Sequence, residues 1–262
     1  MDLGYSGRRC LVTASTGGLG LAIARAMAAE GAEVFVNGRN HETVDKAVAC
    51  LGGEVPGAKV NGVVGNSGTA DGCAAIIEGC PEVDVLVVNL GIYEAMDIYS
   101  AGDDRWYNLI ETNVMSGVRL SRHYLPKMLA RDAGRVIFMA SESGINPAPE
   151  MPAYSATKTM QISIARNLAE TTKGTNVTVN SVLPGPCRTE GVANLIAGLY
   201  PDIETAEAER RFVAENRPTS LIQRLSRPEE VADFVTFLGS TRTGIVNGAA
   251  LRIDGGLIRT VM

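Results

Sequence analysis

The sequence predicts a single α/β domain, residues 1–262, built on a doubly wound and mainly parallel β-sheet. Two observations lead to this prediction. Short runs of β-branched residues alternate along the chain with segments of helical pattern, which is typical of parallel βαβ units. Most of the short runs are also apolar on both faces, as expected of strands that lie between two helix layers. No repeat, low-complexity tract or change of composition marks a second domain.

The expected elements follow one another as strand and helix, the strand runs being short and the helix segments longer. Strands are expected at residues 8–14, 32–38, 58–65, 83–91, 134–141, 176–184 and 249–254. Helices are expected at residues 19–31, 41–51, 69–79, 103–130 and 153–172.

The region between Pro184 and Pro228 interrupts this alternation and carries a charged helix candidate at residues 203–216. Inserted structure after a late strand lies where α/β proteins bind ligands, outside the carboxyl ends of the strands. We therefore expect residues 186–226 to form a lid over a substrate site. A plain helical hairpin on the surface is the alternative.

The composition excludes several classes of protein. Hydrophobic residues make up 45% of the chain and charged residues 20%, which fits a globular protein and argues against disorder. The formal net charge is -5 and no basic stripe is present, so we expect no nucleic-acid partner.

The same composition bears on compartment and metals. The N-terminus has no apolar core of signal-peptide length, and the longest apolar run is too short to cross a bilayer. We expect a cytoplasmic protein without membrane association. The five cysteines are an odd number without paired spacing, so free thiols are expected. With two histidines in the chain, we expect no metal site.

A glycine-rich turn, TASTGGLG at residues 13–20, stands between the first strand and the first helix. Glycines let the backbone approach a pyrophosphate, and the helix N-terminus offers N–H donors and a positive dipole end. Such a turn by itself indicates little, because any strand-helix turn can need glycines. Its position after the first strand predicts dinucleotide binding.

The end of the second strand bears on the choice of cofactor. A carboxylate there would bind the adenosine ribose hydroxyl and indicate NAD(H), but the residues are Asn37, Gly38 and Arg39. Arg39 suits a 2′-phosphate, because its planar guanidinium makes charge-assisted bonds to phosphate. The alternative is a tight Asn-Gly turn with a solvated arginine. We expect NADP(H) in preference to NAD(H).

Ser141, Tyr154 and Lys158 are the candidates for chemistry. Tyr154 and Lys158 are four residues apart at the start of a helix, so they share one face. An ammonium beside a tyrosine favours the phenolate, and a nearby serine could hold a carbonyl oxygen. Each feature alone has an ordinary explanation, as a helix face or as a serine cap.

The order of these motifs carries a resemblance. With TASTGGLG, VNLG at residues 88–91, Ser141, YSATK at 154–158 and PGPCRT at 184–189, the sequence resembles the short-chain dehydrogenase/reductase family. The resemblance extends from about Arg8 to IDGG at residues 253–256. It implies a Rossmann fold of about seven strands in the order 3-2-1-4-5-6-7 with helices on both faces. It also implies a homo-oligomer, a tetramer or dimer.

Residue by residue, the resemblance implies a catalytic set of Asn113, Ser141, Tyr154 and Lys158. Together with Arg39, the expected cofactor-binding residues are Thr13, Ser15, Thr16, Gly18, Leu19, Gly20, Asn66, Ser67, Asn89, Gly91, Tyr154, Lys158, Pro184, Gly185 and Thr189.

The sequence departs from the family pattern at several positions. Ala14 stands where the family usually has its first glycine, so the turn is expected to keep a backbone angle that alanine tolerates. Val88 and Leu90 replace an asparagine and an alanine, Asn66 replaces the common aspartate, and Cys187 occupies a site that is usually aliphatic. The catalytic set is intact.

The resemblance also implies roles for the catalytic set. Free tyrosine titrates near 10, and Lys158 is expected to lower the pKa of Tyr154 and to reach the nicotinamide ribose. Ser141 would donate a hydrogen bond to the substrate oxygen. Asn113 would hold a water that links Lys158 to solvent.

We expect other roles for three further residues. Ser143, two residues from Ser141, is assigned to the pocket wall. Glu142 is expected near the mouth, where it either recognises a polar substrate or forms a structural ion pair. His123 is expected to be structural.

The leading hypothesis is an NADP(H)-dependent enzyme that acts on a ketone or a secondary alcohol. A dinucleotide-binding regulator without redox chemistry is the alternative, and loss of NADPH absorbance with a panel of carbonyl compounds would separate the two. A nucleotide-sugar epimerase would need a larger C-terminal domain than this chain has. A 3-oxoacyl thioester, a cyclic ketone and a sugar-like alcohol all remain open as substrates. The expected pocket is largely apolar, with candidates Tyr93, Ile145, Met151, Pro186, Val192, Leu195, Ile196, Leu199 and Tyr200.

Overall fold

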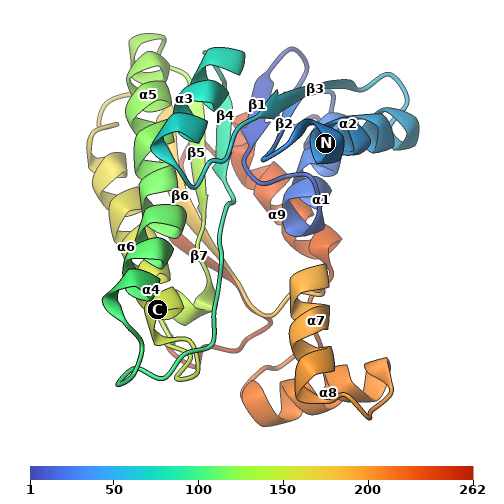
Figure 1. Cartoon of the computed structure of the whole chain (residues 1–262). Helices are drawn as coiled ribbons and strands as arrows, with labels where there is room; N and C mark the ends of the chain where they lie inside the picture. The colour runs from blue at the N-terminus through green and yellow to red at the C-terminus, as the bar shows by residue number, and fades with distance from the viewer. Residues whose placement is uncertain (262) are drawn as a thin grey trace.

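Seven parallel strands form one sheet in the computed structural model, which describes residues 1–261 (Figure 1). The order across the sheet is β3-β2-β1-β4-β5-β6-β7, which confirms the predicted doubly wound Rossmann fold. The strands are β1 (Arg9–Val12), β2 (Glu33–Gly38), β3 (Lys59–Val64), β4 (Val85–Val88), β5 (Gly134–Met139), β6 (Val177–Pro184) and β7 (Ala250–Ile253).

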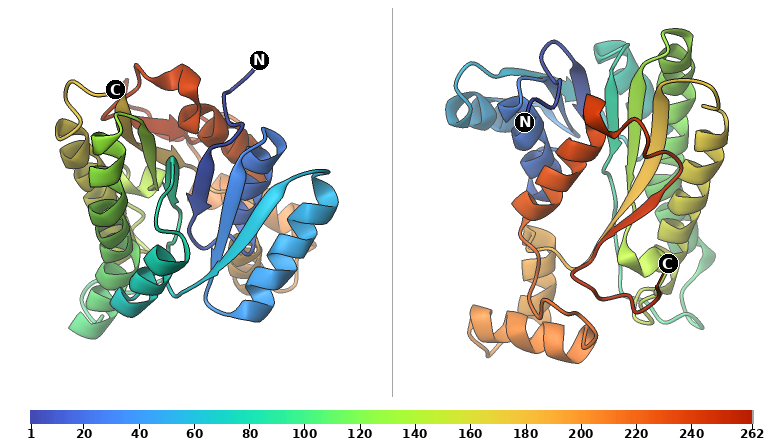
Figure 2. Two further views of the ribbon diagram at one scale, coloured as in Figure 1. Left: turned by 90° about the horizontal axis from the view of Figure 1, so that it is seen from above. Right: turned by 180° about the vertical axis from the view of Figure 1, so that it is seen from behind.

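Two helix layers cover the sheet, as the two-sided apolar strands predict. Successive side chains of a strand point to opposite faces, so in β1 Cys10 and Val12 enter one core while Leu11 enters the other. Figures 1 and 2 show these layers on either side of the sheet. One layer holds α1 (Gly18–Ala29), α2 (His41–Glu54) and α9 (Pro228–Gly239), and the other holds α3 (Ala70–Gly79), α5 (Ser116–Ala130) and α6 (Pro152–Glu170).

Helix α9 was not among the elements expected from the sequence. It begins with Pro228 at its first turn and with Glu229 and Glu230 in that turn, where proline and acidic residues are favoured. The Glu230 carboxylate accepts a 2.8 Å hydrogen bond from the Arg227 backbone N–H. These signals precede the apolar face that packs against α1.

The helical segment expected at residues 103–130 is divided into three parts. Helix α4 (Asp103–Leu109) continues into a π-helical turn (Ile110–Met115) and then into α5. Such a turn adds a residue to the helical ladder and often lies at functional sites. The periodicity of the sequence did not indicate this turn. Asn113 lies within it and is fully buried.

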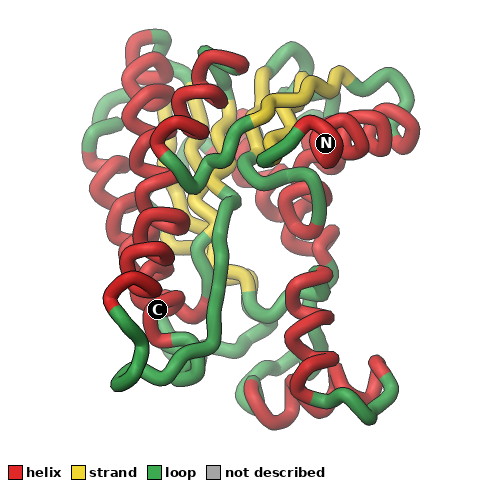
Figure 3. The backbone as a smooth tube through the Cα atoms, in the orientation of Figure 1, coloured by secondary structure: helices red, strands yellow, loops and turns green. Residues whose placement is uncertain are grey.

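Residues after β6 form two helices, α7 (Glu190–Leu199) and α8 (Thr205–Asn216), and α8 is the charged helix expected from the sequence. They pack on each other through Ile196, Phe212 and Val213. Figures 2 and 3 show that the pair projects from the main body beyond the carboxyl end of β6. Short 3-10 turns complete the described structure at Glu142–Gly144 and Thr241–Thr243. Within residues 1–261, no helix has the length and apolar character needed to cross a membrane.

Candidate active site

A cavity of ≈ 310 Å³ lies where the carboxyl ends of the central strands face α7 and α8. It joins the glycine-rich turn to the segment that carries Ser141 and Tyr154. The residues expected from the sequence that line it are Leu19, Gly20, Asn89, Gly91, Tyr93, Ser141, Glu142, Ser143, Met151, Tyr154, Lys158, Pro184, Gly185, Pro186, Thr189, Val192 and Leu195.

Other expected residues lie outside this lining. From the cofactor and catalytic sets they are Thr13, Ser15, Thr16, Gly18, Arg39, Asn66, Ser67 and Asn113, and from the pocket candidates they are Ile145, Ile196, Leu199 and Tyr200. Ile196 instead belongs to the contact between α7 and α8, where it is 2% exposed. The prediction that Ile196 faces the substrate is therefore wrong, because the helix pair needs that side chain for its own core.

Two further cavity residues on or next to α8, Phe212 and Arg217, were not expected from the sequence. The only available signal was the charged helix pattern of residues 203–216, which does not say which side chains face a cavity. Their position depends on how α8 packs against α7 and the sheet.

The N-terminus of α1 is suited to an anion. Gly17 caps the helix in an extended conformation without a side-chain hydrogen bond, and the first turn holds no acidic residue. The first N–H groups of a helix lack intrahelical partners, so these donors and the helix dipole are available to a phosphate. A Cβ at Gly20 would lie 2.4 Å from the Ala14 carbonyl oxygen, so a side chain there would not fit. These features fit the pyrophosphate of a dinucleotide.

Three polar side chains of the expected cofactor set are used to hold the strand ends together. Thr13 Oγ1 accepts hydrogen bonds from the backbone N–H groups of Asn89 and Leu90, at 2.9 and 3.1 Å. Asn89 Nδ2 donates to the Thr13 and Ala14 carbonyls. Ser15 Oγ donates to the Val12 carbonyl at 2.6 Å. These contacts shape the loop between β1 and α1.

The end of β2 presents an arginine and no acid. Asn37 is buried, and its amide accepts from the Ala14 N–H and donates to the Val63 and Gly65 carbonyls. This amide is therefore occupied by the backbone and forms a structural link. Arg39 is exposed immediately after the strand.

Tyr154 and Lys158 share one face of α6, as their spacing predicts. The Lys158 Nζ atom lies 5.5 Å from the centroid of the Tyr154 ring. Burial lowers the pKa of Lys158 to about 7. Burial also raises the pKa of Tyr154 to about 12, although a hydrogen bond with the Ser141 side chain acts in the opposite direction. The net pKa of Tyr154 is therefore above its ordinary value and not below it as expected, because desolvation outweighs the groups that act to lower it.

Ser141 ends the run that begins with β5 and caps the 3-10 turn Glu142–Gly144. Its Oγ accepts a 3.2 Å hydrogen bond from the Ser143 backbone N–H, and the residue is 8% exposed. The Ser141 side chain also acts to lower the pKa of Tyr154, against the effect of burial. Ser143 lines the cavity wall, as predicted.

Asn113 does not present its side chain to the cavity. Its Oδ1 accepts from the Ile92 N–H at 2.8 Å, and its Nδ2 donates to the Ile92 carbonyl and to Thr157 Oγ1 at 2.8 and 3.0 Å. The amide therefore ties the loop after β4 to the helices behind the site. The main-chain carbonyl of Asn113 accepts a further hydrogen bond from Gln161 Nε2.

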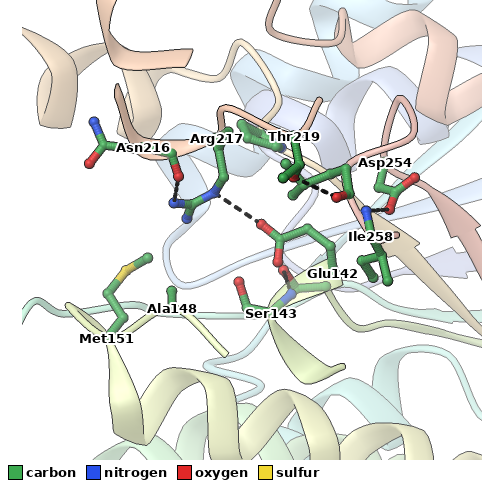
Figure 4. A network of polar contacts seen from close by, with 12 residues as sticks. Glu142, Ser143, Ala148, Met151, Asn216, Arg217, Thr219, Asp254 and Ile258 are labelled. Atoms are coloured by element: carbon green, nitrogen blue, oxygen red, sulfur yellow. Dashed lines mark hydrogen bonds and ion pairs between the residues drawn. The ribbon is translucent and has the colours of Figure 1, made fainter. Parts of the chain in front are cut away.

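Glu142 forms a buried ion pair in the cavity wall, and both of its expected roles stay compatible with this position. Arg217 Nε lies 3.4 Å from Glu142 Oε1, with side-chain exposures of 12% and 5%. Figure 4 shows the arginine reaching the carboxylate from the segment after α8. Burial raises the pKa of Glu142, while Ser143 and Arg217 act to lower it. Arg217 also lies 3.3 Å from Glu150.

His123 lies away from this site, in agreement with a structural role. Its Nε2 is 3.0 Å from the Pro81 carbonyl oxygen. Its ring contacts Tyr124 edge to face.

Known proteins share this architecture. A family model described as short chain dehydrogenase matches residues 8–199. The chain is 52% identical over 263 residues to the uncharacterized oxidoreductase YvaG of Bacillus subtilis (strain 168), with 100% of both proteins covered. It is similar to the crystal structure of L-sorbose reductase from Gluconobacter frateurii complexed with NADPH and L-sorbose, with a TM-score of 0.93, 31% identity and 100% of both chains covered. It is also similar to a 3-oxoacyl (acyl-carrier-protein) reductase from Agrobacterium tumefaciens C58 with NADP bound, with a TM-score of 0.88, 28% identity and coverage of 97% and 96%.

The backbone at Ala14 generates a prediction about stability. Its φ is 50°, a left-handed conformation that costs a non-glycine residue roughly 1–2 kcal/mol, which contradicts the expectation of an angle that alanine tolerates. Glycine removes this strain but adds entropy to the unfolded chain. We therefore expect Ala14→Gly to raise the free energy of unfolding by about 0.5–1 kcal/mol in urea titrations.

Ala75→Gly is the matched control, because Ala75 is exposed in the middle of α3. That change should lower stability by about 1 kcal/mol. A loss of stability of the same size in Ala14→Gly would contradict the strain at Ala14.

Proposed function

Since this chain belongs to the short-chain dehydrogenase/reductase family and is an NAD(P)-dependent oxidoreductase, we propose that it uses NADP(H) to interconvert a ketone and a secondary alcohol, with Tyr154 as the general acid and base. One observation carries the proposal. A single cavity is lined both by Gly17 and Gly20 of the glycine-rich turn and by Ser141, Tyr154 and Lys158. A reacting carbonyl in this cavity would lie between a dinucleotide and a proton donor.

The protein's part in carbonyl reduction is to hold the substrate oxygen and to supply a proton. The nicotinamide, when bound, supplies the hydride that reduces the carbonyl carbon. Ser141 donates a hydrogen bond to the substrate oxygen, which stabilises developing negative charge. Tyr154 Oη transfers its proton to that oxygen, so that the alcohol and a phenolate are formed.

The pKa values support Tyr154 as the donor in this direction. With a pKa raised to about 12 by burial, the phenol keeps its proton at neutral pH. Once the proton has left, the nearby Lys158 ammonium and the Ser141 hydroxyl stabilise the phenolate. Alcohol oxidation begins instead from the phenolate, which becomes more populated as the pH rises.

The preference for NADP(H) rests on Arg39. No acid stands at the end of β2, the Asn37 amide is occupied by backbone groups, and Arg39 is exposed next to them. A guanidinium in this place suits the 2′-phosphate. The presence of NADPH or NADP in the two similar solved structures supports the same choice.

The substrate class that fits the cavity is a ketone with hydroxyl groups beside the carbonyl. Met151, Leu195 and Phe212 give one part of the wall an apolar character, but Glu142 and Arg217 place a buried charged pair in another part. A carboxylate accepts hydrogen bonds from hydroxyl groups and a guanidinium donates to them. The similarity to a reductase of L-sorbose supports this class over an acyl thioester.

We also assign residues 186–226 as the lid. Val192 and Leu195 of α7 and Phe212 of α8 line the cavity, so the helix pair covers the substrate as well as packing on itself. Arg217 connects the end of α8 to Glu142 beside Ser141, and this ion pair would hold the lid closed.

The catalytic assignment predicts that Tyr154→Phe lowers kcat for carbonyl reduction by about 10²- to 10⁴-fold, because general acid catalysis contributes that much. NADPH binding, followed by its fluorescence, should remain. Tyr107→Phe is the control, since Tyr107 is 67% exposed on α4. Full turnover in Tyr154→Phe would rule out this tyrosine as the proton donor.

The cofactor assignment predicts that Arg39→Ala weakens NADPH binding by about 10- to 100-fold, the worth of hydrogen bonds to a charged group. NADH binding should change little, because NADH lacks the 2′-phosphate. Fluorescence titration of both cofactors measures the difference, with the exposed Arg122→Ala on α5 as the control. Tighter binding of NADH than NADPH by the unaltered protein would contradict the preference.

The substrate assignment predicts that kcat/KM with NADPH is about 10- to 100-fold higher for a hydroxy ketone than for its deoxy analogue of equal length, because the wall would otherwise lack hydrogen-bond partners. Steady-state kinetics with matched pairs of ketones and with a 3-oxoacyl thioester measure this ratio. Higher kcat/KM for the thioester or the deoxy ketone would assign the cavity to another class.

A further inference from the structure

The ammonium group of Lys158 is held from two sides. The residue is 3% exposed, and its Nζ donates to the Met139 carbonyl at 2.7 Å and to Gln161 Oε1 at 2.9 Å. An ammonium group has three N–H donors in a tetrahedral arrangement. Two fixed acceptors therefore determine where the third N–H points, and Lys158 lines the cavity. The first acceptor is a main-chain carbonyl of β5, whereas the second is the side chain of Gln161.

Gln161 is itself fixed at both ends of its amide. Its Oε1 accepts from Lys158, and its Nε2 donates to the Asn113 main-chain carbonyl at 2.5 Å. The residue is 0% exposed and lies three positions after Lys158 on α6, on the same face. Because one partner is a donor and the other an acceptor, the amide can face only one way.

This bridge differs from the contact that the family resemblance implies. That resemblance places a water between Asn113 and Lys158. Here the Asn113 side chain is bound to Ile92 and Thr157, and its carbonyl receives the Gln161 amide. The link from the π-helical turn to Lys158 therefore runs through a side chain of α6.

We propose that Gln161 is a positioning residue, which fixes the Lys158 ammonium between Met139 and Asn113 and aims its remaining N–H into the cavity. The proposal rests on the proposed function of Lys158 and Tyr154. A neutral amide neither gains nor loses a proton in the neutral range, so the bridge orients the ammonium and does not carry protons. The amide of Gln161 serves both contacts. Leucine at this position would leave the Asn113 carbonyl without this donor, and glutamate would place a negative charge beside the lysine.

The surroundings of Lys158 make its titration a direct readout of this contact. Tyr154 is the titratable side chain that faces it, with the ring centroid 5.5 Å away. The other neighbours are the Met139 carbonyl, the Gln161 amide and the backbone at Gly91, where a Cβ would lie 3.2 Å from Nζ. A change at Gln161 should therefore appear in the lysine itself.

The experiment titrates Lys158 by NMR in protein with ¹³Cε-labelled lysine and without added cofactor, with the signal assigned through Lys158→Met. We expect Gln161→Glu to raise the pKa of Lys158 by about 1 unit or more, because an opposite charge favours the ammonium. Gln161→Leu should lower that pKa, because an acceptor is lost inside the protein. Asn167→Leu, which removes an exposed amide from the same helix, should leave it unchanged.

Kinetics of the same variants then test the consequence for the reaction. Gln161→Leu should lower kcat with NADPH by about 10-fold or more, the worth of a hydrogen bond to a charged group, while NADPH binding changes less. Circular dichroism shows whether each variant is folded, and either folded variant decides the question. If the pKa of Lys158 is the same in both variants as in the unaltered protein, the proposal is overturned. Absence of NADPH oxidation with every carbonyl compound would overturn the proposed function instead, and the titration does not depend on it.

Discussion

A lysine ammonium buried beside a tyrosine is the interaction on which the site depends. Burial disfavours the charged form of the lysine and raises the pKa of the phenol. The protein offsets this with a carbonyl from β5 and an amide from α6, both at hydrogen-bond distance from Nζ. The sheet, the π-helical turn and α6 must therefore keep their relative positions if the ammonium is to stay oriented. The packing of these elements around the site therefore keeps the acceptors of the Lys158 ammonium in place.

The cofactor side of the cavity depends on a backbone constraint of a different kind. The chain turns sharply between β1 and α1, with Ala14 in the left-handed region. Asn37 of β2 and Asn89, which follows β4, bind the peptide groups of this residue. Such over-determination is what allows a strained residue to persist. The result is a helix N-terminus whose first N–H groups face the cavity without a competing side chain.

The substrate side is defined by elements that are distant in sequence. Glu142 follows β5, whereas Arg217 follows α8, and they meet inside the cavity wall. A buried ion pair is weak evidence for stability, because desolvation offsets its attraction. Its position next to Ser141 and at the end of the helix pair supports the proposal that it holds the lid closed. The same pair gives a polar part to a pocket that composition alone described as apolar.

The sequence by itself determined the sheet, its order through the family resemblance, and the catalytic spacing. Apolar runs specify buried strands, and residues four apart on a helix must share a face, so the spacing of Tyr154 and Lys158 alone places them together. Local patterns did not reveal α9, the π-helical turn or the inward face of α8, because these depend on packing between distant segments. Only the tertiary structure decided that burial dominates the pKa of Tyr154, that the Asn113 side chain is occupied by Ile92, and that Gln161 reaches Lys158. The physical reason is the same in each case: desolvation and hydrogen-bond partners are set by three-dimensional neighbours, which a one-dimensional pattern does not contain.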